Sequence, residues 1–473
     1  MSVSNLISAL YAALRPRARG YPVDSRNVNA LSTPAEFLHA LHDCISSARQ
    51  RIALASLYVG AEGPHERAVL DAVAAASRKC KDVDVTLLMD ARRACRPVGG
   101  RDPGTSSAAA CAATLLPAGA RVYLHNVPHP LGRALPHRAR ELLGVSHVKA
   151  AVFDDTVLWT GANLSEQYLT HRQDRYVVIR NAPELADATC KLLQTVHSHS
   201  GMLQADASIA WPRAGHGGAE NSKRSSSALT RELMALLKPN EASPKKTMQA
   251  DTCAFLTMQA GYSGLNHDME CISAALHAVS AAEPRPCIAL ATPYCNLASS
   301  PTTAELLRAL AAQAEVQVLT ASLSSHAWAG DKATLKTGVS AHVAPAYSLL
   351  THQTAEALYR RRGDGGMTSW WEYSTPGRPF HAKGLWVGHD SSAATVAATL
   401  VGSTNFGPRS AARDLEMNCM LVTTSESLQR ALGAEWNGLK QQAHHVSLEQ
   451  LAQRRRECGL GGAVVASVAA AWM

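Results

Sequence analysis

The chain contains one short motif twice, and this duplication limits the folds that it can adopt. A histidine and a lysine two residues apart occur at His147 and Lys149, and again in the second half of the chain at His381 and Lys383. Further segments repeat in the same order, such as IALASLY at 52–58 and IALATPY at 288–294. Repeats in a constant order indicate two homologous halves. We therefore expect two similar domains, each carrying one copy of the motif.

Polar residues follow both copies at matching distances. Asn163 and Asn405 each end a turn of small residues, and Ser403 lies in the second turn. Asp174 and Glu416 then follow at the same distance from the two asparagines. We expect the amides and the hydroxyl to bind phosphate oxygens, and each carboxylate to orient a histidine by holding the proton on one ring nitrogen.

The repeated residue types suit chemistry at phosphorus. A histidine and a lysine two apart on a strand point to the same face, so imidazole and ammonium can converge on one phosphate. One neutral imidazole can attack phosphorus and form a phosphohistidine, while a second one moves protons. The lysines and asparagines would hold the non-bridging oxygens. Together they predict a covalent phosphoryl or phosphatidyl transferase that needs no metal ion and no cofactor. Asp154, seven residues after His147, is grouped with the catalytic motif and is expected to fix local structure or the lysine.

Composition narrows the class of protein. At 473 residues the chain is long enough for two domains with substantial cores. The net charge of +8 favours anionic partners such as nucleic acid, acidic lipid or phosphorylated metabolites. The 11 cysteines include no Cys-x-x-Cys pair, which disfavours a disulfide framework or a thiolate zinc site and predicts buried thiols in a reducing compartment.

Strand-like and helical runs alternate in both halves, which predicts an α/β architecture. A helix is expected at 66–79, where apolar residues recur at helical spacing. Strands are expected at 51–59, 83–89, 121–125, 148–153 and 176–179, and at 287–292, 315–320, 384–387, 395–401 and 418–422. The linker, at 213–250, is rich in Gly, Ser, Lys and Pro and reads as an exposed loop with one short helix near 233–237. A second insert, 360–367, is expected to be a surface loop or a flap.

The motif pair resembles the phospholipase D superfamily, whose members pair two His-x-Lys motifs across a pseudo-twofold interface. Longer runs are similar to the eukaryotic mitochondrial phosphatidylglycerophosphate synthases: GANLSEQY at 161–168, HRQDRY at 171–176 and FHAKGLW at 380–386. The resemblance extends from about residue 33 to residue 442. Two departures from the superfamily pattern, Gly388 in place of Asp and Thr160-Gly161 in place of Gly-Ser, also resemble this subgroup, and Asp390 is left out of the site.

The resemblance implies a fold and a reaction. The fold is α/β, with two homologous phospholipase D-like α/β/α sandwich halves that form one active site at a pseudo-twofold interface. The reaction is transfer of a phosphatidyl group from CDP-diacylglycerol to sn-glycerol 3-phosphate, with His147 as nucleophile and His381 as general acid/base. An arginine cluster should bind the phosphate of the acceptor. The candidates are Arg172, Arg175, Arg409 and Arg413.

The two ends of the chain suggest a location. Residues 1–30 carry Arg15, Arg17 and Arg19 with no acidic residue before Asp24, a composition typical of a mitochondrial transit segment, the alternative being a disordered basic terminus. The halves then span 31–212 and 251–445. The tail, 446–473, is basic and then apolar, and either lies in a membrane interface or packs on the body as a terminal helix. No run is long enough to span a bilayer. A peripheral enzyme on the matrix side of the inner membrane is expected, in contact with an anionic membrane surface.

Other functions remain open at this stage. A cardiolipin synthase, a phosphatidylserine synthase or a phospholipase D would use the same core with a different acceptor. A nuclease or phosphodiesterase would suit the positive charge, but no groove of interleaved basic and aromatic residues is evident and aromatics are only 5%, so no nucleic-acid partner is expected. An inactive lipid-binding scaffold is the non-enzymatic alternative, although both His-x-Lys pairs are intact.

Overall fold

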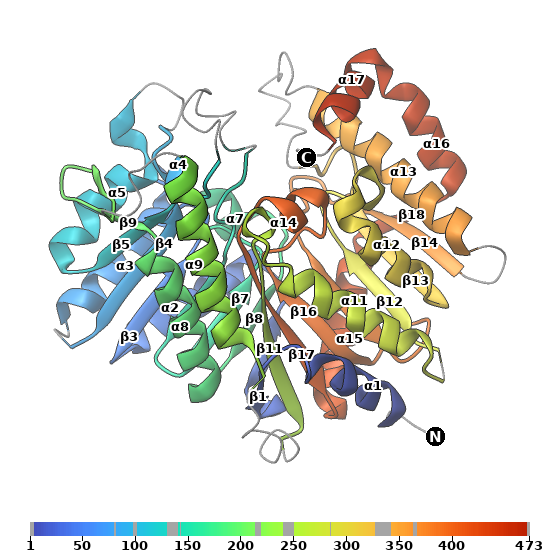
Figure 1. The fold of residues 1–473 in the computed structure, drawn as a ribbon, viewed down its shortest axis with the longest axis horizontal. Helices are drawn as coiled ribbons and strands as arrows, with labels where there is room; N and C mark the ends of the chain where they lie inside the picture. The colour runs from blue at the N-terminus through green and yellow to red at the C-terminus, as the bar shows by residue number, and fades with distance from the viewer. Residues whose placement is uncertain are drawn as a thin grey trace.

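Two nine-stranded mixed sheets form the centre of the protein, one in each half (Figure 1). The computed structural model describes residues 4–79, 82–97, 102–129, 141, 143–212, 219–239, 250–283, 285–326, 342–362 and 367–470. Helices cover the outer faces of the two sheets and also lie between them. The α/β architecture with two similar halves, predicted from the sequence, is confirmed.

The first sheet has the strand order β10-β9-β5-β4-β3-β6-β7-β8-β2. Its strands are β2 (Val28–Leu31), β3 (Arg51–Ala55), β4 (Asp84–Asp90), β5 (Arg121–His125), β6 (Ala150–Phe153), β7 (Thr156–Thr160), β8 (Tyr176–Ile179), β9 (Gly201–Leu203) and β10 (Ile209–Ala210). The helices of this half are α2 (Pro34–Ser47), α3 (Pro64–Lys79), α4 (Ala91–Ala94), α5 (Ser107–Thr114), α7 (Glu166–Thr170) and α8 (Pro183–Ser198).

The second sheet has the strand order β1-β11-β17-β16-β15-β12-β13-β14-β18. Its strands are β1 (Gly20–Val23), β11 (Thr252–Gln259), β12 (Cys287–Ala291), β13 (Glu315–Ala321), β14 (Met367–Tyr373), β15 (Gly384–Gly388), β16 (Val396–Gly402), β17 (Glu416–Thr423) and β18 (Ala443–Val446). The helices are α11 (His267–Ser280), α12 (Ala304–Ala311), α13 (Val343–Arg362), α14 (Pro408–Ala412) and α15 (Glu426–Gln441).

The two sheets repeat one topology. In the first, β3 and β4 are parallel, and β3 also pairs antiparallel with β6, the strand that follows Lys149. In the second, β12 and β13 are parallel, and β12 pairs antiparallel with β15, the strand that follows Lys383. Each motif thus enters a central strand of its own sheet at the same place. This correspondence is the structural form of the sequence repeat.

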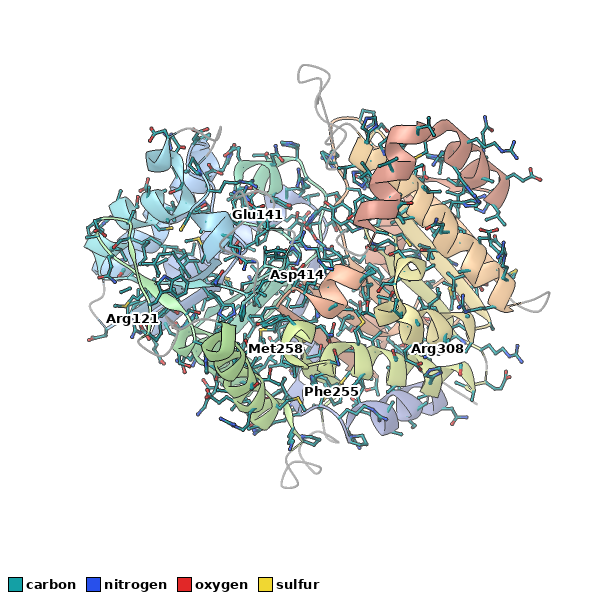
Figure 2. The ribbon with its side chains drawn as sticks, turned by 45° about the horizontal axis from the view of Figure 1, so that its top comes forward. Arg121, Glu141, Phe255, Met258, Arg308 and Asp414 are labelled. Atoms are coloured by element: carbon teal, nitrogen blue, oxygen red, sulfur yellow. The ribbon has the colours of Figure 1, made fainter. Side chains whose placement is uncertain are left out.

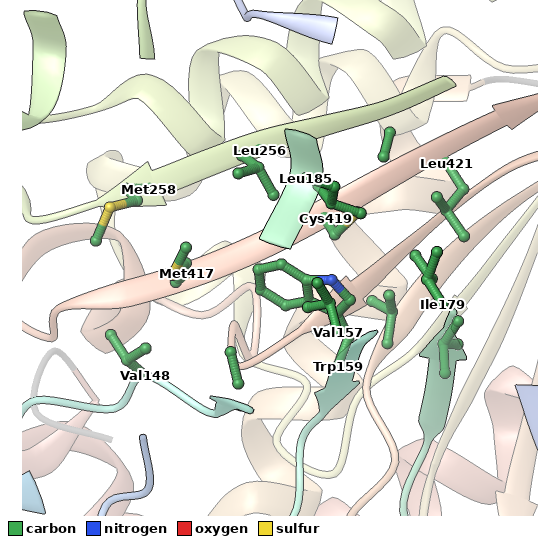
Figure 3. Packing of buried hydrophobic residues seen from close by; sticks show 14 of the residues in the cluster. Val148, Val157, Trp159, Ile179, Leu185, Leu256, Met258, Met417, Cys419 and Leu421 are labelled. Atoms are coloured by element: carbon green, nitrogen blue, oxygen red, sulfur yellow. The ribbon is translucent and has the colours of Figure 1, made fainter. Parts of the chain in front are cut away.

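A shared core lies between the sheets. Trp159 and Ile179 of the first sheet pack in one buried cluster with Leu256 and Met417 of the second, and Leu185 of α8 lies among them (Figure 3). Two further cores lie outside, one beneath α2, α3 and α5 and one beneath α1 (Ser4–Leu14), α11, α12 and α13. Both faces of the central strands are therefore buried, which fixes their registers.

The N-terminal segment belongs to the second half in space. Helix α1, dark blue in Figure 1, packs against α11 and buries four apolar side chains: Leu6, Ile7, Leu10 and Leu14. Strand β1 pairs antiparallel with β11 at the edge of the second sheet, whereas β2 pairs with β8 of the first. The residues expected to be a transit segment thus take part in the fold. Their targeting role remains a prediction.

The linker between the halves is more ordered than its composition indicates. Helix α9 (Ala219–Leu237) is much longer than the short helix expected near 233–237. Leu229, Leu233 and Leu237 are buried in the shared core, and α9 packs against α8. The expectation of an exposed loop is therefore wrong for this part of the linker. In the second insert, residues 360–362 end α13 and Met367 begins β14, while 363–366 lie outside the described residues.

The C-terminal tail forms two helices, α16 (Leu448–Glu457) and α17 (Gly459–Ala469). Helix α17 packs against α13, with Cys458 and Ala466 buried in a small cluster. Leu460 and Val464, one helical turn apart on α17, are 88% and 59% exposed. Among the helices in the described ranges, none is both long enough and apolar enough to cross a bilayer.

Candidate active site

Short backbone bridges join the two halves beside each histidine. Ser146 and Leu415 form an isolated parallel bridge, in which the His147 N–H donates to the Leu415 carbonyl at 2.8 Å. Gln173 and Phe380 form the second parallel bridge, in which the His381 N–H donates to the Gln173 carbonyl at 2.8 Å. Because both bridges are parallel, the next residue along each strand lies beside the histidine of the other half. Those next residues are Glu416 and Asp174.

Each histidine is therefore held by a carboxylate from the opposite half. Nδ1 of His147 lies 3.0 Å from Oε2 of Glu416, and Nδ1 of His381 lies 2.6 Å from Oδ2 of Asp174. All four side chains are buried or nearly so, and both carboxylates are completely buried. We place a proton on Nδ1 of each imidazole, facing its carboxylate, which leaves Nε2 as the reactive nitrogen.

Burial keeps both imidazoles neutral. It lowers the pKa of His147 well below 6.5, and Lys149 lowers it further. Burial likewise lowers the pKa of His381, and Lys383 adds to the effect. A neutral imidazole has a free lone pair at neutral pH, which both a nucleophile and a general base require.

The lysines approach the histidines differently. Nζ of Lys149 donates to the carbonyl of its own motif residue His147 at 3.0 Å. Nζ of Lys383 lies 2.8 Å from Nδ1 of His381 and 3.3 Å from Oδ2 of Asp174. Both ammonium groups are buried, and burial lowers the pKa of each. Two buried cations at one site are well suited to bind a phosphodiester anion.

The asparagines occupy equivalent positions. The side-chain Oδ1 atoms of Asn163 and Asn405 are both buried and make no hydrogen bond to the described residues. Ser403 has a structural contact as well, because its Oγ accepts from the Met417 N–H at 3.1 Å and so joins the turn to β17. The two amides therefore have unused bonding capacity on the same atom in both halves.

Tyr168 and Arg172 were not given a common role by the sequence, but the structure joins them at His381. The Tyr168 hydroxyl lies 3.3 Å from Nε2 of His381, and Nη1 of Arg172 donates to that hydroxyl at 2.8 Å. Burial raises the pKa of Tyr168, so the phenol keeps its proton and can donate it to Nε2. Tyr168 follows Asn163 within the run GANLSEQY, but nothing in the run indicates this contact.

The other candidate arginines mostly have structural partners. Arg175 is buried, forms a bidentate ion pair with Glu435 at 2.7 and 2.8 Å, and also donates to the Leu400 carbonyl. Arg409 pairs with Asp414 at 2.9 Å and donates to the Glu141 carbonyl at 2.8 Å, at the junction between the halves where Figure 2 labels both acidic residues. Arg413 is half-buried, and burial followed by the charge of Arg409 lowers its pKa.

Asp154 lies outside the centre, which corrects its grouping with the catalytic motif. It occupies the two-residue turn between β6 and β7, with φ of 50°. Its carboxylate accepts from the backbone N–H groups of Arg49, Gln50 and Arg51 at 2.8 to 3.0 Å. Asp154 therefore anchors the start of β3 at the end of β6 remote from the motif.

A further buried carboxylate, that of Asp90, holds the backbone just before the first motif. Asp90, at the end of β4, accepts from the Ser146 N–H at 2.9 Å and from the Arg93 N–H at 2.7 Å. Burial raises the pKa of Asp90 to about 7, while these two backbone donors oppose the rise. Since Asp90 is far from His147 in sequence and belongs to no repeat, the sequence offered no signal for it.

Comparison with known proteins agrees with this geometry. A family model described as "Cardiolipin synthase, PLD-like domain" matches residues 41–196. The mitochondrial CDP-diacylglycerol–glycerol-3-phosphate 3-phosphatidyltransferase of Mus musculus is 31% identical over 88% of this chain and 78% of its own length. The protein of the same name from Homo sapiens is 30% identical over 93% and 82%.

The likeness extends to a solved structure. The crystal structure of phosphatidylserine synthase from Haemophilus influenzae Rd KW20 superposes with a TM-score of 0.71 at 18% identity, covering 98% of this chain and 100% of the other. At that identity it supports the fold. The sequence relatives go further, because they are similar along most of their length and carry the same name in several organisms. The protein therefore belongs to the family of CDP-diacylglycerol–glycerol-3-phosphate 3-phosphatidyltransferases.

Proposed function

We propose that the protein transfers a phosphatidyl group from CDP-diacylglycerol to sn-glycerol 3-phosphate, producing phosphatidylglycerophosphate and CMP. The names of its relatives supply the substrates. The observation that supports the chemistry is the pair of neutral imidazoles, each held through Nδ1 by a buried carboxylate from the other half.

In the first step, Nε2 of His147 attacks the phosphorus that carries the diacylglycerol. A P–N bond forms, the P–O bond to CMP breaks, and CMP leaves as a phosphate that needs little protonation. His147 is assigned as nucleophile because its Nε2 makes no hydrogen bond within the described ranges, whereas Nε2 of His381 contacts Tyr168. The side chain of His147 is also the more exposed, at 10% against 5%.

In the second step, Nε2 of His381 removes the proton from a primary hydroxyl of the acceptor. The new alkoxide oxygen bonds to phosphorus, the P–N bond breaks, and His147 is regenerated. An alcohol is a poor nucleophile until a base takes its proton, so this step depends on His381 more than the first does. Lys149, Lys383, Asn163 and Asn405 bind the non-bridging oxygens in both steps, where negative charge develops.

CMP release is the decisive measurement for this function. CDP-diacylglycerol in detergent micelles is incubated with the full chain, with and without glycerol 3-phosphate, and both CMP and lipid products are measured. We expect CMP release that depends on glycerol 3-phosphate, with phosphatidylglycerophosphate as the lipid product. Release that is equally fast without the acceptor would indicate a hydrolase, and a product made only with another alcohol would indicate a different synthase.

We also propose that the protein works as a peripheral enzyme on the matrix side of the mitochondrial inner membrane. The relatives are named mitochondrial. The membrane contact is assigned to α17, where Leu460 and Val464 are exposed, and to Arg455 and Arg456 just before it, which are also exposed. An apolar stripe beside a basic collar binds acidic bilayers through both burial and charge.

Vesicle sedimentation tests the membrane contact. We expect the protein to bind vesicles that contain acidic phospholipid, and the double variant Leu460→Ser/Val464→Ser to bind them at least severalfold more weakly. Met202→Ser, at an exposed apolar residue on β9 in the other half, is the control and should bind as the wild type does. Equal binding by both variants would remove α17 from the contact.

A further inference from the structure

Within the described residues, two arginines without a carboxylate partner lie at the site, each stacked on a tyrosine: Arg172 beside His381, and Arg93 beside the backbone that precedes His147. We propose that Arg93 and Arg172, with Tyr58 and Tyr168 beneath them, form the subsite that binds the phosphate monoester of the acceptor. This inference rests on the proposed function and deepens it, since it identifies how a phosphorylated alcohol is distinguished from a plain one.

Arg172 is a partly buried cation with neutral partners only. Its Nη1 donates to the Tyr168 hydroxyl at 2.8 Å and its Nη2 to the side-chain carbonyl of Gln167 at 2.6 Å. Its guanidinium lies over the Tyr168 ring, 4.5 Å from the centroid, and Nε is buried with no partner in the described ranges. A cation held by neutral groups is left with an uncompensated charge, which an anionic ligand can neutralise.

Arg93 has even fewer contacts. Its guanidinium lies 3.7 Å from the centroid of the Tyr58 ring, and within the described part of the chain it forms no hydrogen bond or ion pair. The backbone beneath it is fixed, because the Arg93 N–H and the Ser146 N–H are bound by the same carboxylate of Asp90. The Asp90 carboxylate thus fixes the backbone of Arg93 relative to Ser146, the residue just before His147.

The two arginine–tyrosine pairs are neighbours. The Tyr58 hydroxyl lies 3.1 Å from Oγ of Ser165, the residue that precedes α7, and Tyr168 is on α7. Tyr58 and Tyr294 both contribute to the raised pKa of Tyr168, after burial, so each of these two phenols lies within electrostatic reach of Tyr168. The pairs therefore belong to a single tyrosine-walled region next to His381.

The position favours the acceptor over CMP as the source of the bound phosphate. Arg172 is joined through Tyr168 to Nε2 of His381, the atom assigned to deprotonate the acceptor. A phosphate dianion needs about two cations, and the guanidinium fork binds its oxygens in pairs. Arg172 is also one of the charges that lower the pKa of His381, so an anion bound there would make His381 a stronger base when the acceptor is present.

The test compares two reactions of the same full-length enzyme in CDP-diacylglycerol micelles. Exchange of labelled CMP into CDP-diacylglycerol reports the donor half-reaction, and transfer to glycerol 3-phosphate reports the complete reaction. We expect Arg93→Gln and Arg172→Gln each to raise the KM for glycerol 3-phosphate by about 10- to 100-fold, as the loss of a charge-assisted hydrogen bond predicts, while CMP exchange changes by less than about twofold. Arg430→Gln, on the exposed face of α15, is the matched control and should change neither.

The outcomes separate the possible sources of phosphate. Equal loss of exchange and transfer would overturn the proposal and assign the arginines to CMP or to the fold. An unchanged KM for glycerol 3-phosphate would also overturn it. Transfer to glycerol, which lacks the phosphate, should be as slow in the two variants as in the wild type, and a further large decrease would contradict the assignment. Because the Arg93 side chain makes no polar contact with the described residues, its variant should fold normally even if Arg172→Gln does not. A wild-type enzyme that performs neither reaction would instead refute the proposed function itself.

Discussion

The two half-sites share one backbone construction but differ in the polar residues around it. Tyr168 and Ser410 stand at the same distance after their asparagines, yet the Tyr168 hydroxyl contacts the histidine and the Ser410 hydroxyl donates to Glu416 at 2.7 Å. Two residues before each carboxylate stands Arg172 in one half and Asp414 in the other. Duplication thus places the two histidines symmetrically, and the residues around them support the different roles that we propose for them.

The carboxylates differ in the same way. Burial acts to raise the pKa of Asp174, but Lys383 and His381 outweigh it and the pKa is lowered. For Glu416 burial prevails over Lys149 and the pKa is raised. The carboxylate of Asp174, beside His381, is therefore firmly ionised, whereas the carboxylate of Glu416, beside His147, lies closer to its neutral form. A general base benefits from a fixed negative partner, and a nucleophile benefits from a carboxylate that does not bind its imidazole too strongly.

Removing each histidine in turn should separate the two roles most clearly. His147→Ala should abolish both CMP exchange and transfer, by about 10⁵-fold or more, because no P–N bond can form. His381→Ala should lower transfer by about 10²- to 10⁴-fold but CMP exchange by less, because CMP leaves without much protonation. Rapid-mix assays of the two half-reactions measure both effects. Equal loss of both half-reactions in His381→Ala would contradict the division of roles.

We expect the loss of activity to be larger when the more strongly ionised of the two carboxylates is substituted. Asp174→Asn is expected to lower the rate of transfer by about 10³-fold, because the amide N–H can donate to Nδ1 of His381 and so favour the tautomer with its proton on Nε2. Glu416→Gln should lower the rate by at least tenfold less, since Glu416 carries less of its charge in the folded protein. Steady-state kcat for the two variants, at matched protein folding judged by thermal melting, tests this. The reverse order would refute the comparison.

Alanine substitutions at two glycines in equivalent turns should have different effects, one on activity and the other on stability. A Cβ at Gly161 would collide with the carboxylate of Asp174 and the ammonium of Lys383, so Gly161→Ala should mainly reduce activity. Gly402 has φ of 152°, and a Cβ there would meet the Met417 carbonyl and Asn418. Gly402→Ala should therefore lower the free energy of unfolding by about 1 to 3 kcal/mol. Denaturant unfolding and CMP exchange, measured on both variants, distinguish the two effects, and an inactive but fully stable Gly402→Ala would contradict them.

The smallest expected effect is on the pH profile. Because the pKa values of both histidines lie well below 6.5, the acid limb of the rate should have its midpoint below pH 6.5. Protonation below that point removes the lone pairs and hence the activity. The Ser410 hydroxyl lowers the pKa of Glu416, so Ser410→Ala should raise it. A Glu416 that carries less charge stabilises the protonated His147 less, so the acid limb should move downward by less than about one pH unit. Ser427→Ala, at an exposed serine of α15, should leave the limb unchanged.

The sequence predicts the repeated part of the fold well. The strands β5 and β8 occur at their expected bounds, and the helix expected at 66–79 occurs as α3. Strand β7 was missed, although Asp154 forms the hairpin turn before it. Strand β11 was missed because both of its faces are buried, so its sequence lacks the alternation that marks a half-exposed strand.

The active-site residues can likewise be divided into those that repeat, which the sequence predicts, and those that do not repeat. The residues that repeat, such as His147, His381, Asp174 and Glu416, could be found from the sequence, although their pairing across the halves could not. The roles of residues whose partners are remote in the sequence could not be predicted. Arg175 is a structural residue because Glu435 neutralises it, and Asp90 supports the motif through Ser146, contacts that only the folded chain creates.

The crossing of carboxylates between the halves has a consequence for synthesis of the chain. His147 leaves the ribosome long before Glu416, which lies 269 residues later, and β1 has no strand partner among the described residues until β11 has been made. A nascent or truncated chain therefore contains His147 without the group that holds its Nδ1 proton in place. Under the proposed mechanism, the full reactivity of His147 toward phosphorus arises only after Glu416 has been synthesised, so a shorter chain is less reactive toward lipid.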